Sequence, residues 1–122
     1  MMVQVKIYGL RDRLFPKIQS MSDTVHACLM ETLNVPPDKR FHRFMTLEPE
    51  TFLYPDDRTE NYTILEISMF EGRTVETKKR LIRLLFERFQ SDFDIAPLDL
   101  EITLLETPKA NWGVRGMLGD EL

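Results

Sequence analysis

The sequence has one cysteine, Cys28, in 122 residues, so no disulfide can form within the chain. Its apolar runs are only a few residues long, whereas a membrane-spanning helix needs roughly 20 consecutive apolar residues. The N-terminus lacks a basic region followed by an apolar core, which is the pattern of a secretory signal. We therefore expect a cytoplasmic protein with no membrane-spanning segment.

Basic residues are also in short supply. Lys and Arg number 16 against 20 Asp and Glu, which gives a formal net charge of −4 and a pI near 5.2. Proteins that bind nucleic acids or anionic membranes usually carry a surplus of positive charge. The composition therefore argues against both kinds of partner. His26 and His42 have no partners at metal-binding spacing, and no phosphate loop or Ser-His-Asp arrangement is present. We expect no metal or other cofactor.

The first half of the chain predicts a strand, a helix and a second strand. Apolar residues alternate with polar ones from Met2 to Tyr8, which is typical of a half-buried strand. Apolar steps of three and four residues then predict a helix from Leu14 to about Asn34. The segment Val35-Pro36-Pro37-Asp38 ends this helix, because proline disfavours helical geometry in the residue before it. A strand is expected from Arg40 to Leu47.

The second half begins with another transition from strand to helix. Alternating apolar residues between Leu65 and Met69 predict a strand, and Gly72 ends it. Thr74 is the expected N-cap of a helix that ends near Asp92. The apolar stripe expected to face the core from this helix is Val75, Ile82, Leu85, Phe86 and Phe89.

The remaining segments connect these elements or follow them. A loop is expected from Glu48 to Asn61, with a short ribbon through Thr51 to Tyr54. The last predicted strand runs from Leu100 to Glu106 and precedes a tail from Thr107 to Leu122. At 122 residues the chain has room for one domain of ordinary size, so we expect a single domain over residues 1–122.

The two halves match each other. Each half has a strand of alternating apolar residues followed by an arginine, and the two sets are separated by a constant number of residues. Val3, Val5, Ile7 and Arg11 thereby align with Leu65, Ile67, Met69 and Arg73. The sequence thus predicts pseudo-repeats over about residues 1–47 and 62–106, each a β-α-β unit with a helix long enough to join parallel strands. Right-handed crossovers would place both helices on one face of a four-stranded mixed sheet, an α+β fold.

The segment Phe70-Glu71-Gly72-Arg73-Thr74-Val75-Glu76-Thr77-Lys78-Lys79 resembles the Gly-Arg-Thr/Ser-x-Glu-x-Lys signature of the tautomerase superfamily. That superfamily includes oxalocrotonate tautomerase and macrophage migration inhibitory factor. Residues 35–41, 48–55 and 106–113 resemble its malonate semialdehyde decarboxylase-like branch. The resemblance implies two β-α-β units per subunit and a homotrimer whose sheets pack around a threefold axis.

The resemblance also implies site residues. Arg73 matches an arginine that binds substrate carboxylate, Asp38 matches an acid near the catalytic group, and Trp112 matches an aromatic residue of the pocket wall. In the family the catalytic group is an amino-terminal proline. Here Met1 occupies that position and no proline precedes Pro16, so the amine of Met1 is the candidate base.

Each assignment has a structural alternative. Asp38 could be a turn residue that hydrogen-bonds its own backbone, and Arg73 could be a solvated arginine at a helix start. Trp112 could instead be buried at a subunit contact. The decarboxylase has a second arginine where this chain has Glu71, and an acid there opposes a dicarboxylate-like substrate.

The sequence therefore predicts a superfamily member that has a small carboxylate-accepting pocket for a 2-keto acid and weak or altered keto–enol proton transfer. The alternative is a non-catalytic member that binds a ligand or another protein. A trimer is expected because sheet edges and an apolar sheet face would otherwise be exposed.

Overall fold

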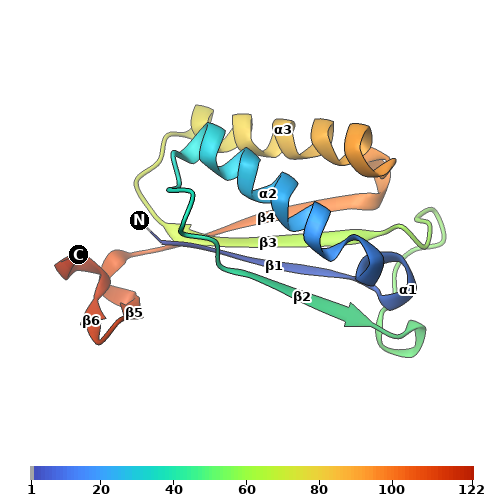
Figure 1. Ribbon diagram of the computed structural model, residues 1–122, viewed down its shortest axis with the longest axis horizontal. Helices are drawn as coiled ribbons and strands as arrows, with labels where there is room; N and C mark the ends of the chain where they lie inside the picture. Colours follow the sequence, from blue (N-terminus) through green and yellow to red (C-terminus); the bar gives the residue numbers. More distant parts are fainter. Residues whose placement is uncertain (1) are drawn as a thin grey trace.

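The structure is a computed structural model that describes residues 2–122. Its main sheet has the strand order β2-β1-β3-β4, formed by β1 (Val3–Leu10), β2 (His42–Leu47), β3 (Thr63–Phe70) and β4 (Leu100–Thr107). β1 is parallel to β2 and antiparallel to β3, and β3 is parallel to β4. Both long helices, α2 (Ile18–Leu33) and α3 (Val75–Phe93), cover one face of this sheet (Figure 1). The predicted α+β fold with a mixed four-stranded sheet is confirmed.

The first helical segment starts earlier than predicted and is divided. α1 (Arg11–Leu14) follows β1 directly, and a 3₁₀ turn over Phe15–Lys17 separates it from α2. Pro16 lies in that turn, where its missing N–H and its ring prevent a regular α-helical ladder. The prediction of one helix from Leu14 was therefore wrong at its start, although the end at Leu33 agrees within one residue.

The long helices end in the same way in both halves. Asn34 and Asp94 adopt left-handed backbone conformations, with φ of 58° and 55°. The amides of the next residues, Val35 and Ile95, reach back to carbonyls of the last helical turn at 3.5 and 3.2 Å, as in a Schellman motif. Val35 and Ile95 are buried, so each turn returns the chain to the core.

The core lies between the helices and the sheet. Its buried members include Val5, Ile7, Met21, Val25, Cys28, Leu29, Leu65, Ile67, Met69, Leu81, Leu85 and Phe89. The prediction that Val75 faces this core was wrong, because its side chain is 59% exposed. Leu81 and Leu85 mark the buried face, and Val75 is turned about 120° from Leu81 at 100° per residue.

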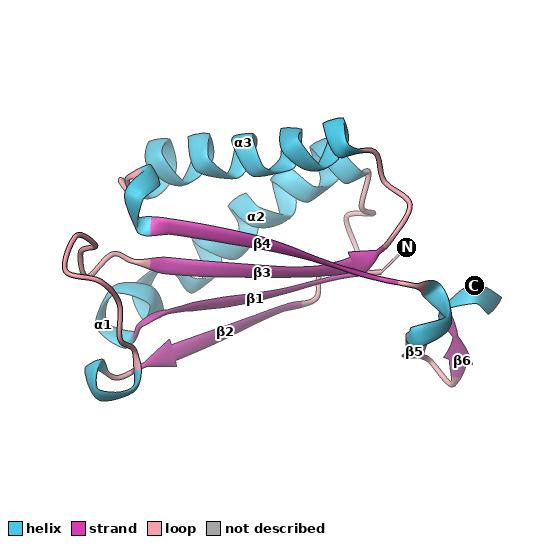
Figure 2. Ribbon diagram, turned by 180° about the vertical axis from the view of Figure 1, so that it is seen from behind, coloured by secondary structure: helices cyan, strands magenta, loops and turns pink. Residues whose placement is uncertain are grey.

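The other sheet face carries no helix (Figure 2). Its residues include Lys6, Glu66 and Ser68 beside Ile64 and Leu105, and the hydroxyl of Tyr8 donates to Glu66 at 2.5 Å. Polar and apolar side chains are therefore mixed there, and the expectation of an apolar face was wrong. Strand alternation fixes which residues point to this face but does not make all of them apolar.

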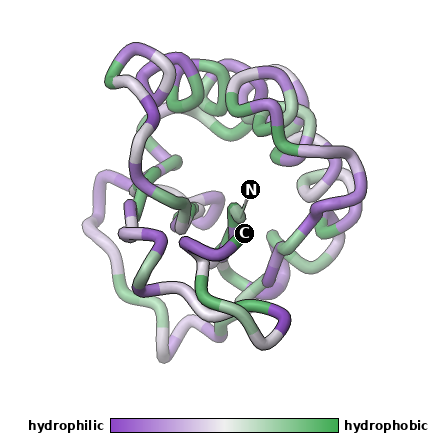
Figure 3. Tube along the Cα trace, turned by 90° about the vertical axis from the view of Figure 1, so that its left-hand side faces the viewer, coloured by the Kyte–Doolittle hydropathy of each residue, from purple (hydrophilic) through white to green (hydrophobic). Residues whose placement is uncertain are grey.

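Chain segments at the two ends of the sheet complete the fold. The loop after β2 contains a 3₁₀ turn over Pro49–Thr51, and the ribbon expected at Thr51 to Tyr54 is not formed. After β4, a 3₁₀ turn over Lys109–Asn111 leads into a hairpin of β5 (Gly113–Val114) and β6 (Met117–Leu118). Seen along the strands, the helices and the sheet form two layers, and this tail lies at the end nearest the viewer (Figure 3). Within residues 2–122 no helix is both long and apolar enough to span a membrane.

Candidate functional site

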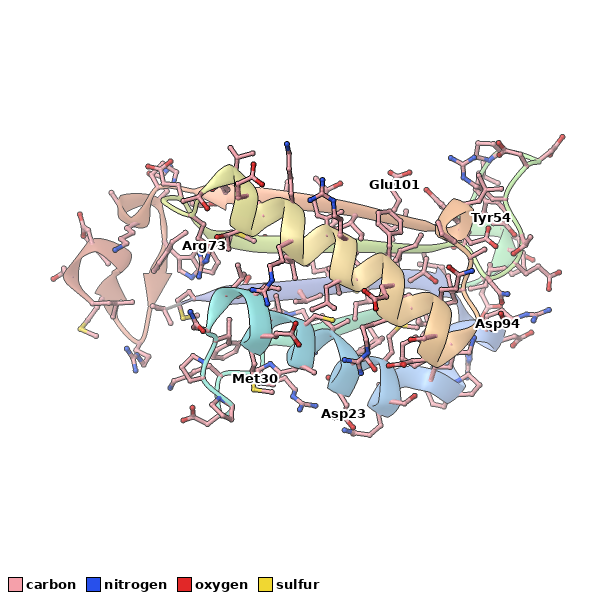
Figure 4. The ribbon with its side chains drawn as sticks, turned by 90° about the horizontal axis from the view of Figure 1, so that it is seen from above. Asp23, Met30, Tyr54, Arg73, Asp94 and Glu101 are labelled. Carbon is pink, nitrogen blue, oxygen red and sulfur yellow. The ribbon has the colours of Figure 1, made fainter. Side chains whose placement is uncertain are left out.

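Arg73 is positioned by the turn between β3 and α3. Gly72 has φ of +117°, a conformation that favours glycine. One residue after Arg73, the Thr74 hydroxyl accepts a hydrogen bond from the Thr77 amide at 3.1 Å, which confirms the predicted N-cap. Such caps stabilise a helix by about 1 kcal/mol. Figure 4 shows Arg73 at the start of α3, next to the tail.

The guanidinium of Arg73 has hydrogen-bond partners for only some of its donors. Its Nη1 donates to the Phe70 carbonyl at 3.2 Å, whereas its Nη2 is buried and has no hydrogen-bond partner within residues 2–122. Burial lowers the pKa of Arg73, and the negative charge of Glu106 opposes this shift. A buried donor without a partner is costly, and a carboxylate could accept from it in the planar geometry that a guanidinium favours.

Arg73 faces a cavity of about 430 Å³ at this end of the molecule. Its lining combines backbone at the β3–α3 turn with residues of the tail, namely Phe70, Glu71, Gly72, Arg73, Lys109, Gly119 and Leu122. The charged lining residues are two cations, Arg73 and Lys109, and one acid, Glu71. The side chains that line the cavity therefore carry a surplus of positive charge, unlike the chain as a whole, and the negative charge of Glu106 acts on Arg73 from outside the lining.

The tail is folded tightly against Phe70. The Phe70 and Trp112 rings meet edge to face with centroids 5.2 Å apart, and Lys109 Nζ lies 5.9 Å from the Phe70 centroid. The Gly119 amide donates to the Trp112 carbonyl at 2.6 Å. A side chain at Gly119 would collide with the Lys109 carbonyl, so this glycine permits the close approach that fixes Lys109 at the cavity.

Trp112 does not line the cavity of Arg73. It supports the Phe70 wall from behind and lines a separate hollow of about 280 Å³ with Gln4 and Ser68. In the isolated chain Trp112 therefore acts on the Arg73 cavity through Phe70.

Asp38 is not brought into this cavity either. It is an exposed residue in a turn that spans Pro36 to Lys39, where the Lys39 amide donates to the Pro36 carbonyl at 3.0 Å. No hydrogen bond or ion pair of its carboxylate is found within residues 2–122. The turn follows α2 at the end of the sheet where α3 begins (Figure 1), so Asp38 and Arg73 share one end of the molecule.

Two further assignments concern the start of the chain and metals. Met1, the candidate base, lies outside the described residues, and the following Met2 is buried. Within residues 2–122 no three His, Cys, Asp or Glu side chains cluster closely enough to hold a metal ion.

Lys109 is a cavity residue that the sequence did not reveal. Its segment Pro108-Lys109-Ala110-Asn111 lacks periodicity, and its place depends on tail contacts distant in sequence. Its nearness in sequence to Trp112, the one tryptophan, is the only local signal that could have suggested it.

Comparisons with known proteins agree with the fold. The family described as tautomerase enzyme matches residues 39–115, more than half of the chain, including Arg73 and Trp112. The chain belongs to this tautomerase family.

Individual relatives extend the match over most of the chain. Probable tautomerase YusQ of Bacillus subtilis (strain 168) is 27% identical over 115 residues, which cover 90% of this chain and 89% of YusQ. The solved structure of FG41 malonate semialdehyde decarboxylase, inhibited by 3-bromopropiolate, is 26% identical with a TM-score of 0.74 and covers 90% of this chain and 87% of that one. A fused 4-OT, a wild-type asymmetric trimer, shares the fold at 16% identity with a TM-score of 0.85 and 97% coverage of both chains.

Proposed function

We propose that this protein binds a small carboxylate, such as a 2-keto acid, in the Arg73 cavity and has weak or altered keto–enol tautomerase activity. Arg73 carries this proposal, because it lines a cavity that also contains Lys109 and its Nη2 has no hydrogen-bond partner within residues 2–122. Inhibition of the FG41 decarboxylase by 3-bromopropiolate, itself a small carboxylate, supports the ligand class.

The proposed reaction moves one proton from carbon to oxygen. With the carboxylate of a 2-keto acid held by Arg73, a base removes a proton from C3, and the resulting enolate takes a proton on its oxygen. The amine of Met1 is the proposed base, and α-amino groups titrate near ~7.7–8.0 in model peptides. A flexible primary amine lacks the fixed orientation of a proline ring, which is why we propose low activity. Asp38 is proposed to assist this proton transfer.

The proposed assembly is a homotrimer. It is supported by the trimeric fused 4-OT with the same fold and by the uncovered sheet face with edge strands β2 and β4. Trp112 is partly exposed in the isolated chain, and in such a trimer a neighbouring subunit would lie beside it.

The proposed activity is tested with phenylpyruvate, an enolisable 2-keto acid, by following its enol absorbance. The parent should turn over slowly, Arg73→Ala should lose that turnover, and Arg83→Ala on the exposed side of α3 should keep it. Equal rates in Arg73→Ala and the parent would remove Arg73 from the reaction.

A second variant separates the catalytic proposal from a non-catalytic one. In a chain expressed from Met1, a proline inserted between Met1 and Met2 should become the first residue after removal of the initiator, checked by mass spectrometry. Faster tautomerisation than the parent would support a working pocket that lacks only its base. A folded and processed variant that tautomerises no faster than the parent would favour the alternative, a non-catalytic binding or interaction module. The observation that supports this alternative is the methionine at position 1.

A further inference from the structure

A pair of histidines between α2 and β2 lies outside the Arg73 cavity. His26 on α2 is 1% exposed, and His42 begins β2. Their ring centroids are 5.8 Å apart and the rings are inclined at 69°. Each ring has one nitrogen, Nδ1 of His26 and Nε2 of His42, that is buried without a hydrogen-bond partner among the described residues.

The hydrogen bond of His26 determines where its proton lies. Its Nε2 is 3.1 Å from the carbonyl oxygen of Pro37. A carbonyl can only accept, so Nε2 carries the proton and donates. The Nδ1 of a neutral His26 is therefore an acceptor.

The hydrogen bonds of His42 lead to the complementary tautomer. Its Nδ1 is 2.7 Å from the hydroxyl oxygen of Ser22, and Arg40 Nη1 donates to the same oxygen at 3.4 Å. The Ser22 hydroxyl has no other acceptor in residues 2–122, so it donates to Nδ1 of His42. The Nε2 of a neutral His42 then carries a proton, but it makes no hydrogen bond to Nδ1 of His26.

The Pro37 carbonyl that His26 binds belongs to the turn that carries Asp38. Pro37 and Asp38 are the two central residues of this turn, which the bond between the Lys39 amide and the Pro36 carbonyl closes. An exposed two-residue turn tip has few packing contacts of its own, so a donor from the buried helix α2 fixes its position relative to the core.

We propose that His26 is a positioning residue that holds the Asp38 turn against α2, by donating from its Nε2 to the Pro37 carbonyl. The functional consequence rests on the proposed function, because it concerns Asp38 as a group that assists the reaction.

Charged groups of α2 and of the segment before β2 lie near His42. Arg40 forms an ion pair with Asp23 at 2.6 Å beside Ser22, and Figure 4 shows Asp23 on α2. From β1, the uncharged Val5 lies opposite His42 in the sheet register, and the turn contributes Asp38 and Lys39. Burial, followed by His26 and Arg40, lowers the pKa of His42 to about 4.

The test is amide hydrogen exchange by NMR, read as the protection factor of the Lys39 amide. The variants are His26→Gln, whose side-chain amide retains a donor near the Nε2 position, and His26→Leu, which has none. At pH 7 His26→Leu should lower Lys39 protection about 3- to 10-fold, as expected for a lost hydrogen bond, and His26→Gln should stay within about 2-fold of the parent. The amide of Ile67, central in β3, reports global unfolding and is used to correct for it.

If His26→Leu fails to fold, the shorter His26→Asn replaces it and should show the same loss. Equal corrected Lys39 protection in the donor and non-donor variants would overturn the proposal. Hydrogen exchange is measured without substrate, so its result does not depend on whether the protein has tautomerase activity.

Discussion

Lys109 lies over the aromatic ring of Phe70, with its Nζ 5.9 Å from the ring centroid, and both residues line the cavity that contains Arg73. A residue of the tail thereby adds a cation to a cavity formed mainly at the β3–α3 turn. No acidic group pairs with Lys109 within residues 2–122, so its charge is available to an anionic ligand.

The Lys109→Met variant should bind phenylpyruvate about 1.5- to 5-fold more weakly than the parent at low salt, the range for an exposed charge pair. Methionine keeps an apolar stem of similar length and removes only the charge. The difference should shrink in about 1 M salt, where the Debye length falls to about 3 Å. Lys79→Met, on exposed α3 surface, is the matched control, and equal losses in both variants would show that Lys109 has no specific role.

The packing of the tail makes a prediction for Gly119. In Gly119→Ala the new methyl group would meet the Lys109 carbonyl and the Phe70 ring, so the tail must shift. We expect altered fluorescence of Trp112, the only tryptophan, and weaker phenylpyruvate binding. Gly113→Ala is the control, because its nearest neighbour, the Met117 carbonyl, would lie at an ordinary 4.0 Å. Identical spectra and affinities for the two alanine variants would contradict this packing.

The lowered pKa of His42 predicts how stability depends on pH. Because its pKa falls from 6.5 to about 4 on folding, the unfolded chain binds more protons between these values, and stability is lost as the pH falls through this window. We expect a loss of about 1–2 kcal/mol in the free energy of unfolding, allowing for solvent screening of a half-buried ring. Urea unfolding at pH 7, 6, 5 and 4 measures it.

His42→Asn should lack this part of the pH dependence. Asp23 and Asp92 have lowered pKa values, through their hydrogen bonds to Arg40 and Arg88 respectively, so their contributions are lost only below about pH 4. Parallel curves for the parent and His42→Asn above that pH would refute the assignment to His42.

The proposed assembly predicts a mass in solution. Light scattering at micromolar concentration should give three times the 14.4 kDa subunit mass. Trimer formation would remove the uncovered sheet face and the strand edges from solvent. A concentration-independent mass of one subunit would contradict the proposed trimer.

The sequence predicted the elements whose causes are local. Alternation defined β1 and β3. The N-cap at Thr74 and the proline segment from Val35 to Asp38 set one end of each long helix to within a few residues. Errors arose where tertiary context decides. Val75 fits an apolar stripe by residue type, but the phase of α3 turns it to solvent.

The candidate site was predictable only in part. Arg73 follows from a strand-to-helix junction and from the family resemblance, both visible in the sequence. Lys109 reaches the same cavity because Gly119 allows the tail to fold back, a contact that no local pattern encodes. Met1 and Asp38 remain predictions, since Met1 lies outside the described residues and Asp38 lies outside the cavity in the isolated chain.

The central claim is that Arg73 anchors a ligand carboxylate, and calorimetric titration with phenylpyruvate tests it most directly. Arg73→Ala should bind about 10- to 150-fold more weakly than the parent, which corresponds to the roughly 1.5–3 kcal/mol typical of hydrogen bonds to charged groups. Arg83→Ala, an exposed arginine of α3, should bind like the parent, and circular dichroism should show all three folded. Unchanged affinity in a folded Arg73→Ala would contradict the account.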